Sequence, residues 1–138
     1  MAKPAQALSR EWRDLLVRAR AAGRRAYAPY SNFHVGAAVV TGRGGVFTGC
    51  NVENASYGLT ICAERAAVFA AVAAEGRAMR LARIVITVDA DRAFPPCGAC
   101  RQVLAEFGGP DTPVVYAARG VAPVHTTLGA LLPQAFSL

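Results

Sequence analysis

The chain has 138 residues, of which 54% are hydrophobic and 17% charged, and 15 Lys and Arg against 9 Asp and Glu give a net charge of +6. This length fits one compact domain over residues 1–138, and the apolar content excludes a disordered chain. The polar start, residues 1–10, does not resemble a signal or transit peptide, and no stretch approaches the length of a membrane span. We therefore expect a globular, cytoplasmic protein without a membrane partner.

The positive charge could indicate a nucleic-acid partner. However, five of the basic residues fall within one amphipathic stretch: Arg10, Arg13, Arg18, Arg20 and Arg24. Arginines in such a stretch usually form a solvated helix face whose stems cover apolar surface. We favour that interpretation and expect no nucleic-acid partner.

The first predicted element is a helix over residues 9–27, capped by Ser9 and stopped by Pro29. It rests on apolar residues at helical spacing, namely Leu8, Trp12, Leu15, Leu16 and Ala19. Two β-prone runs follow, 35–41 and 45–51, joined by a turn over residues 42–44 that contains two glycines. Together they predict a β-hairpin.

The second half of the chain alternates helices and strands. An Ala-rich segment, 60–76, predicts a buried helix that ends at a glycine. The apolar runs 84–88 and 113–117 predict buried strands, and a helix over 97–107 separates them, beginning after two prolines and stopping at two glycines. Residues 128–133 predict at most a short helical turn. This order indicates an α/β sandwich with a mixed sheet.

Three of the four cysteines lie at predicted helix starts, which favour the thiolate form that binds metal. Cys62 opens the Ala-rich helix, and Cys97 and Cys100 are three residues apart on one face of the next. Three protein ligands leave the fourth position of a tetrahedral zinc open for water, as in catalytic sites. Glu64 lies in the same first turn as Cys62 and can reach that water without being a ligand.

Other interpretations stay open at this point. Cys97 and Cys100 alone match a thioredoxin-like redox pair, although such a pair leaves Cys62 and Glu64 unexplained. A closed structural zinc site would need Cys50 as fourth ligand, and a thiol at the end of a β-prone run is more simply a small buried side chain. The two histidines, His34 and His125, stand alone in the sequence and are interpreted as ordinary polar residues.

The chain resembles the small homotetrameric, zinc-dependent cytidine deaminases almost from end to end. The two-part motif is Cys62-Ala63-Glu64 and, about three dozen residues later, Pro96-Cys97-Gly98-Ala99-Cys100. Further segments carry the resemblance: 30–37, 49–55, 61–65, 96–102 and 131–133. It implies a three-layer α/β/α sandwich with a mixed five-stranded sheet and one Zn²⁺ per subunit. It also implies hydrolytic deamination of cytidine, and of deoxycytidine, in pyrimidine salvage.

The resemblance also assigns roles at the reacting centre. Glu64 would move protons between the water, N3 of the pyrimidine and the departing amine, although a carboxylate in a first helical turn could instead serve only the helix dipole. Arg65 would hydrogen-bond the thiolates and offset their charge, with Gln102 as a further supporting residue.

The same resemblance places the nucleoside. Asn51 and Glu53 would hold the ribose 3′-hydroxyl, and Ala63 would offer backbone contacts to the base. Phe33 and Phe136 would pack against the pyrimidine, with Phe136 supplied by a neighbouring subunit, although either could be plain core. Ala55 and Tyr57 would belong to a loop shared across the interface. A deaminase of a modified nucleoside, of the blasticidin type, is the nearest alternative, and a non-enzymatic structural zinc module is more distant.

Overall fold

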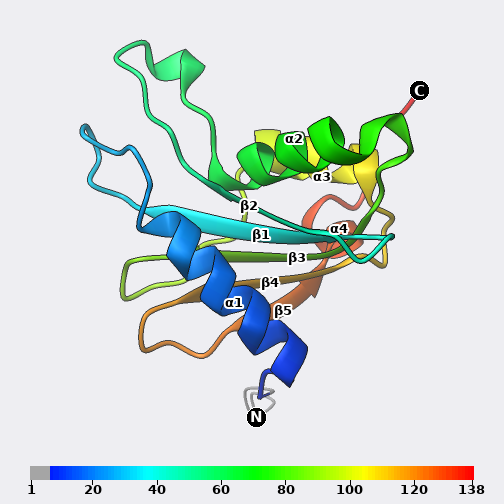
Figure 1. The fold of residues 1–138 in the computed structure, drawn as a ribbon, viewed down its shortest axis with the longest axis horizontal. Coiled ribbons are helices and arrows are strands. Elements are labelled where there is room, and N and C mark those ends of the chain that lie inside the picture. The colour runs from blue at the N-terminus through cyan, green and yellow to red at the C-terminus, as the bar shows by residue number, and fades with distance from the viewer. Residues whose placement is uncertain (1–6) are drawn as a thin grey trace.

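The computed structural model describes residues 7–138, so residues 1–6 of the polar start lie outside the described part. A five-stranded sheet of order β2-β1-β3-β4-β5 forms the middle layer. Helix α1 (Arg10–Gly23) covers one face, while α2 (Ala63–Glu75) and α3 (Gly98–Phe107) cover the other (Figure 1). Within this sheet β3 and β4 pair in parallel, and the other neighbouring strands pair antiparallel. The three-layer sandwich with a mixed sheet is thus confirmed.

Helix α1 begins where the sequence predicts, because the Ser9 hydroxyl accepts a hydrogen bond from the backbone N–H of Trp12. It ends at Gly23, four residues before the predicted end at 27. Gly23 packs against the backbone of Gly36, and the chain then turns so that Tyr27 can pair with Val52 in an isolated bridge. The end of α1 is therefore set by contacts with β1 and with the segment after β2, which the spacing of apolar residues in the sequence does not reveal.

The predicted hairpin is confirmed, with β1 (Val35–Thr41) and β2 (Val46–Cys50) running antiparallel. β1 also pairs with β3 (Leu81–Val88), which starts three residues before the predicted run and lies in the middle of the sheet. β4 (Pro113–Ala118) follows α3 through a crossover connection. Alternate residues of these strands feed two apolar layers, one under α1 and one under α2 and α3.

Helices α2 and α3 begin at the same edge of the sheet. Gly36, at the start of β1, pairs with Cys50 at the end of β2 and with Thr87 near the end of β3. The chain leaves both strands at this edge and enters a helix shortly afterwards. On β2, a Cβ added to Gly49 would lie 2.5 Å from the Ala63 carbonyl oxygen, so the first turn of α2 rests directly on the sheet.

Two features depart from the expectations. The residue patterns did not predict β5 (Val124–Thr127), a short polar strand at the edge of the sheet. It directly precedes α4 (Leu128–Leu131). Helix α2 is not buried all round, because Phe69 on its outer side is 49% exposed. None of the helices within residues 7–138 is long and apolar enough to cross a membrane.

Candidate active site

The three predicted cysteine ligands come together at the shared start of α2 and α3. Cys62 is the N-cap residue of α2, Cys97 is the N-cap residue of α3, and Cys100 lies one turn further along α3. Their Sγ atoms all lie within 4.8 Å of one another, and those of Cys62 and Cys97 are 3.7 Å apart. Cys100 is fully buried, whereas Cys97 is exposed. The cluster therefore has one side closed by protein and one side open.

The donor set fits zinc. Zn–S bonds of about 2.3 Å in a tetrahedron place two sulfurs roughly 3.8 Å apart, close to the observed separation of Cys62 and Cys97. Three soft donors with an open side match a catalytic site, since a structural site closes the fourth position with protein. Nε of Arg65 is buried beside the cluster without a hydrogen-bond partner among the described residues. A buried donor of this kind suits a site that carries extra negative charge when loaded.

Arg65 contacts the cluster directly. Its Nη2 donates to Sγ of Cys62 at 3.4 Å and to the Thr60 carbonyl at 3.5 Å. A hydrogen bond with Cys100, and then the Arg65 guanidinium, lower the pKa of the Cys62 thiol to about 5, despite the opposing effect of burial. The same pairing with Cys62, together with burial, raises the pKa of Cys100. One thiolate is thus already stabilised beside the cation that would neutralise the three-sulfur site.

Glu64 is the buried carboxyl group of the site, at 4% exposure in the first turn of α2. Burial raises its pKa, and the charge of the Cys62 thiolate acts in the same direction. A carboxylate that serves only the helix dipole does not need to be buried, and burial disfavours its charged form. A raised pKa suits a group that must both take and return a proton near neutral pH.

Asn51 is buried at 8% exposure, directly after β2, and its amide is already engaged by backbone. Its Oδ1 accepts from the Val35 N–H at 2.8 Å, and its Nδ2 donates to the Phe33 carbonyl at 2.7 Å. Asn51 is therefore a buried, hydrogen-bonded residue and does not form an exposed strand end. Asn51 fixes the segment that carries Phe33, one of the residues predicted to contact the base.

Glu53 organises the neighbouring loop. Its carboxylate accepts hydrogen bonds from the N–H groups of Tyr30, at 2.9 Å, and Ser31, at 3.1 Å, and from the Ser31 hydroxyl. The Ser31 hydroxyl, followed by these N–H groups, holds the pKa of Glu53 below its ordinary value. A cleft of about 370 Å³ opens here, lined by Glu53, Tyr30 and Ser31 together with Tyr57 and Thr60. The carboxylate stays ionised at neutral pH and borders a space open to solvent.

The remaining predicted substrate residues are largely exposed. Tyr57, in the short 3₁₀ helix η1 (Tyr57–Leu59), is 77% exposed and packs edge-on against Tyr30. Ala55 lies exposed in the same loop, whereas Ala63 is fully buried at the first position of α2. Phe136 is 71% exposed, and its carbonyl accepts from Nε2 of Gln102 at 3.1 Å. The hydrogen bond of Gln102 therefore runs to the C-terminal segment and not to a cysteine.

Sequence reasoning missed two residues beside Phe33. Phe94 packs edge-to-face against Phe33 with ring centroids 5.4 Å apart, and the Arg92 guanidinium lies 4.7 Å from the Phe94 centroid. The sequence patterns assign no site residue to segment 77–94, although Arg92 and Phe94 lie in it. The available signal was an aromatic residue placed three positions before Cys97. Phe33 itself lies at the surface in this stack and is not core.

The other candidate ligands stay apart from the cluster. Within residues 7–138 the only group of three or more metal-binding side chains is the one formed by Cys62, Cys97 and Cys100. Cys50 is a free, half-buried thiol at the end of β2, and His125 packs edge-on against Trp12. His34 lines a different cavity. The structure thus supports neither a closed four-cysteine site nor a histidine ligand.

Comparison with known proteins gives a consistent result. Residues 10–118 match the model of the cytidine and deoxycytidylate deaminase zinc-binding region. A cytidine deaminase of Halalkalibacterium halodurans is 47% identical over 126 residues, which are 91% of this chain and 94% of that protein. One of Mycobacterium tuberculosis is 44% identical over 93% of this chain and 91% of its own length. The crystal structure of cytidine deaminase from Burkholderia pseudomallei has a TM-score of 0.85 at 50% identity, covering 94% of this chain and all of that one.

Proposed function

The chain belongs to the cytidine and deoxycytidylate deaminase zinc-binding family, and we propose from this premise that it is a zinc-dependent cytidine deaminase. It converts cytidine, and by our proposal deoxycytidine, to the corresponding uridine with release of ammonia. The observation that carries this proposal is the joining of three cysteine thiols and one buried carboxyl group at a single sheet edge. Neither a redox pair nor a structural module requires Glu64 there.

Cys62, Cys97 and Cys100 would hold the zinc, with Arg65 offsetting the charge of the thiolates. When bound, zinc supplies the Lewis acidity that makes a water molecule nucleophilic at neutral pH. The positive end of α2 also favours thiolate at Cys62, which is the N-cap residue of that helix. The protein therefore stabilises a metal-binding thiolate before the substrate arrives.

Glu64 would move the protons of the reaction. Attack at C4 of the pyrimidine needs a proton removed from water, a proton placed on N3, and another delivered to the departing amine. A single carboxyl group with a raised pKa can take the first proton from water and give it to N3. It can then take the second proton of that water from the new hydroxyl at C4 and give it to the amine, so that the C4–N bond breaks as the carbonyl of uridine forms. Its burial keeps bulk water from competing for these protons.

Asn51 and Glu53 are proposed to define the ribose end of the site. Glu53 is the ionised carboxylate at the rim of the open cleft, and Asn51 holds the adjoining backbone. A carboxylate that accepts from a free 3′-hydroxyl repels a phosphate at the same position. The enzyme should therefore act on free nucleosides and exclude a continuing nucleic-acid strand.

Substrate competition between cytidine and cytidine 3′-monophosphate tests this assignment. We expect cytidine to be deaminated and the 3′-phosphate to react at least about a hundredfold more slowly, because its charge lies beside the Glu53 carboxylate. Glu53→Gln, which removes the charge, should reduce the discrimination. Comparable rates for the two substrates, or efficient deamination of an oligonucleotide, would remove Glu53 from the ribose site.

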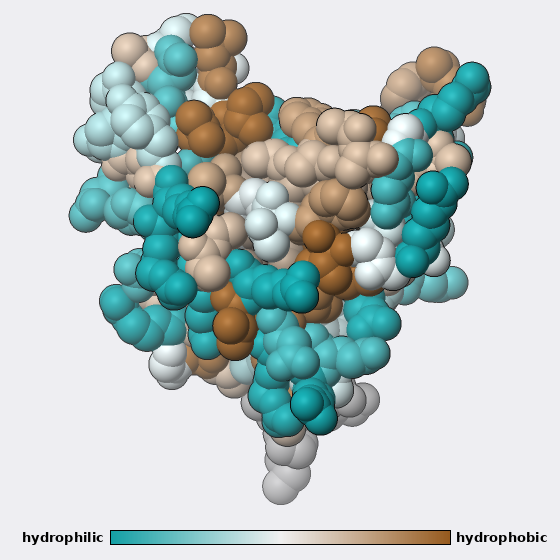
Figure 2. All heavy atoms as spheres, viewed as in Figure 1, coloured by the Kyte–Doolittle hydropathy of each residue, from teal (hydrophilic) through white to brown (hydrophobic). Residues whose placement is uncertain are grey.

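We also propose that the chain works as a homotetramer of single-domain subunits with shared active sites, in pyrimidine salvage in the cytoplasm. Large apolar side chains that are exposed in the single chain support the assembly: Val52, Tyr57, Leu59, Phe69 and Phe136. Hydrophobic atoms gather over α2 and the loop before it, whereas hydrophilic atoms dominate around α1 (Figure 2). Apolar surface gathered in this way is typical of an interface.

A further inference from the structure

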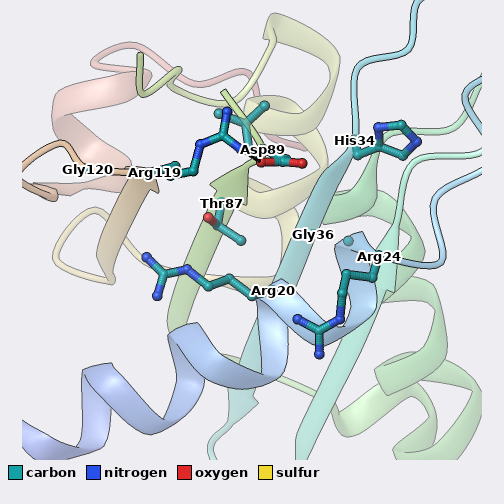
Figure 3. Close-up of a pocket in the computed structure, with 10 residues that line it drawn as sticks. Arg20, Arg24, His34, Gly36, Thr87, Asp89, Arg119 and Gly120 are labelled. Carbon is teal, nitrogen blue, oxygen red and sulfur yellow. Dashed lines mark hydrogen bonds and ion pairs between the residues drawn. The ribbon is translucent and has the colours of Figure 1, made fainter. Parts of the chain in front are cut away.

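A second cavity, of about 780 Å³, lies on the α1 side of the sheet. It is bordered by the last turns of α1, the start of β1, the end of β3 and the turn after β4 (Figure 3). No cysteine ligand and no residue of the ribose cleft lines it, so it is distinct from the proposed active site. Its size is within the range of small-molecule sites.

The lining is strongly cationic. Arg20 lies in the last turn of α1, Arg24 is the C-cap residue that follows this helix, and Arg119 comes from the turn after β4. Asp89 is the acidic residue of the lining, and it already pairs with Arg119 at 2.8 Å. Neither Arg20 nor Arg24 forms an ion pair among the described residues. Two positive charges are thus left in excess, and the imidazole of His34 borders the same space.

The helix dipole explains only part of this arrangement. Arginines near the C-terminal end of α1 are favourable to the helix, and the five arginines of this stretch are all exposed as predicted. That account does not extend to Arg119, which belongs to a different element. It also does not extend to Thr87, a residue of β3 that is 5% exposed and lines the cavity (Figure 3).

Backbone forms the rest of the cavity wall. At Gly36 helix α1 packs directly on β1, because a Cβ there would fall 1.8 Å from the Ala19 carbonyl oxygen, so the backbone closes the cavity on this side. At Gly120, which has a positive φ of 68°, an added Cβ would meet no atom within 4 Å, so the cavity is open on that side. Guanidinium groups from two elements can then reach one ligand from different sides.

We propose that this cavity binds an anion with two or more linked phosphate groups. Arginine forks pair with phosphate oxygens through two parallel hydrogen bonds, so Arg20 and Arg24 would each take one phosphate group. Arg119 donates to Asp89 through one N–H group and can donate to the same ligand through others. The Thr87 hydroxyl would supply an uncharged donor. A linked phosphate chain uses the separated cations better than a single phosphate.

Calorimetric titration of the zinc-loaded protein with inorganic pyrophosphate and with a nucleoside triphosphate tests the proposal at about 0.15 M salt. Both ligands should bind, and inorganic monophosphate should bind at least about tenfold more weakly. Equal affinity for pyrophosphate and triphosphate would assign the site to the phosphates alone, whereas tighter triphosphate binding would add a contact to the nucleoside.

A pair of charge-matched variants locates the site. Arg20→Gln with Arg24→Gln should weaken pyrophosphate binding at least about tenfold, because both free guanidinium groups are lost. Arg10→Gln with Arg18→Gln removes the same charge from the same helix outside the cavity and should weaken it less than about twofold. Equal weakening by both pairs, absence of binding to the unmodified protein, or tighter binding of a single-stranded oligonucleotide than of pyrophosphate would overturn the proposal.

Discussion

The metal end of the proposed active site and its nucleoside end are built differently. Cys100 and Glu64 are buried, and both are fixed by the first turns of helices that rest on the sheet. Tyr57 and Phe136 lie on a loop and a C-terminal segment, and both are more than 70% exposed. One chain therefore holds all the residues proposed for the chemical step, whereas its aromatic residues proposed for substrate binding are left exposed. In a site shared between subunits, a neighbouring subunit would provide the surface against which these aromatic residues pack.

The largest effect expected from a supporting residue is at the metal end. Arg65→Ala removes the cation hydrogen-bonded to Cys62, so zinc affinity and turnover should fall together, by about 10–100-fold. Arg65→Lys keeps the charge without the planar fork and should recover part of both. Zinc competition with a chelator and kcat measured on fully loaded protein separate the two effects. Full zinc content with full turnover in Arg65→Ala would remove Arg65 from the mechanism.

A smaller effect is expected from the nucleoside end. Deletion of residues 136–138 removes Phe136 and the carbonyl that Gln102 contacts, so KM for cytidine should rise by about tenfold. Zinc content should not change, because the cysteines lie elsewhere. Deletion of Leu138 alone is the matched control and should leave KM within about twofold. Unchanged kinetics in the longer deletion would contradict the shared-site model.

The smallest effect concerns pH and the loop held by Glu53. Because its pKa in the folded protein lies below the ordinary value of 4.5, the ionised carboxylate stabilises the fold fully above that ordinary value. The contribution is lost as pH falls through the lower, folded pKa. The difference in unfolding free energy between the unmodified protein and Glu53→Gln should therefore be constant above about pH 5.5 and shrink below it. A difference that grows on acidification would show that the sign is wrong.

Local patterns in the sequence predicted the parts of the molecule that local physics decides. Ser9 caps its helix and the hairpin strand 35–41 has the predicted bounds, because a cap and a β-prone run that ends at turn glycines are short-range signals. The cysteine cluster was predictable from spacing and from the family resemblance together. The end of α1 at Gly23 was not predictable, because it depends on contact with Gly36 of β1. The edge strand Val124–Thr127 was not predictable either, because it is too short and polar to show a strand pattern, although it pairs with the preceding strand β4.

The same distinction explains what was missed at the site. The stack of Phe33 on Phe94 joins residues 61 positions apart, and no periodicity links them. The engagement of the Asn51 amide by the backbone of Phe33 and Val35 is also a tertiary feature. The cationic cavity was hidden in the same way, since Arg119 joins the α1 arginines only in the folded chain.

The most direct test of the central claim is the ultraviolet absorbance of cytidine over time, with the purified protein and with Glu64→Ala, and with zinc content measured in both. We predict conversion to the uridine spectrum by the unmodified protein. Glu64→Ala should retain its zinc and lose at least about a thousandfold in rate, because the proton carrier is gone. Substantial turnover by zinc-loaded Glu64→Ala, or zinc-loaded unmodified protein that leaves cytidine unchanged, would contradict the account.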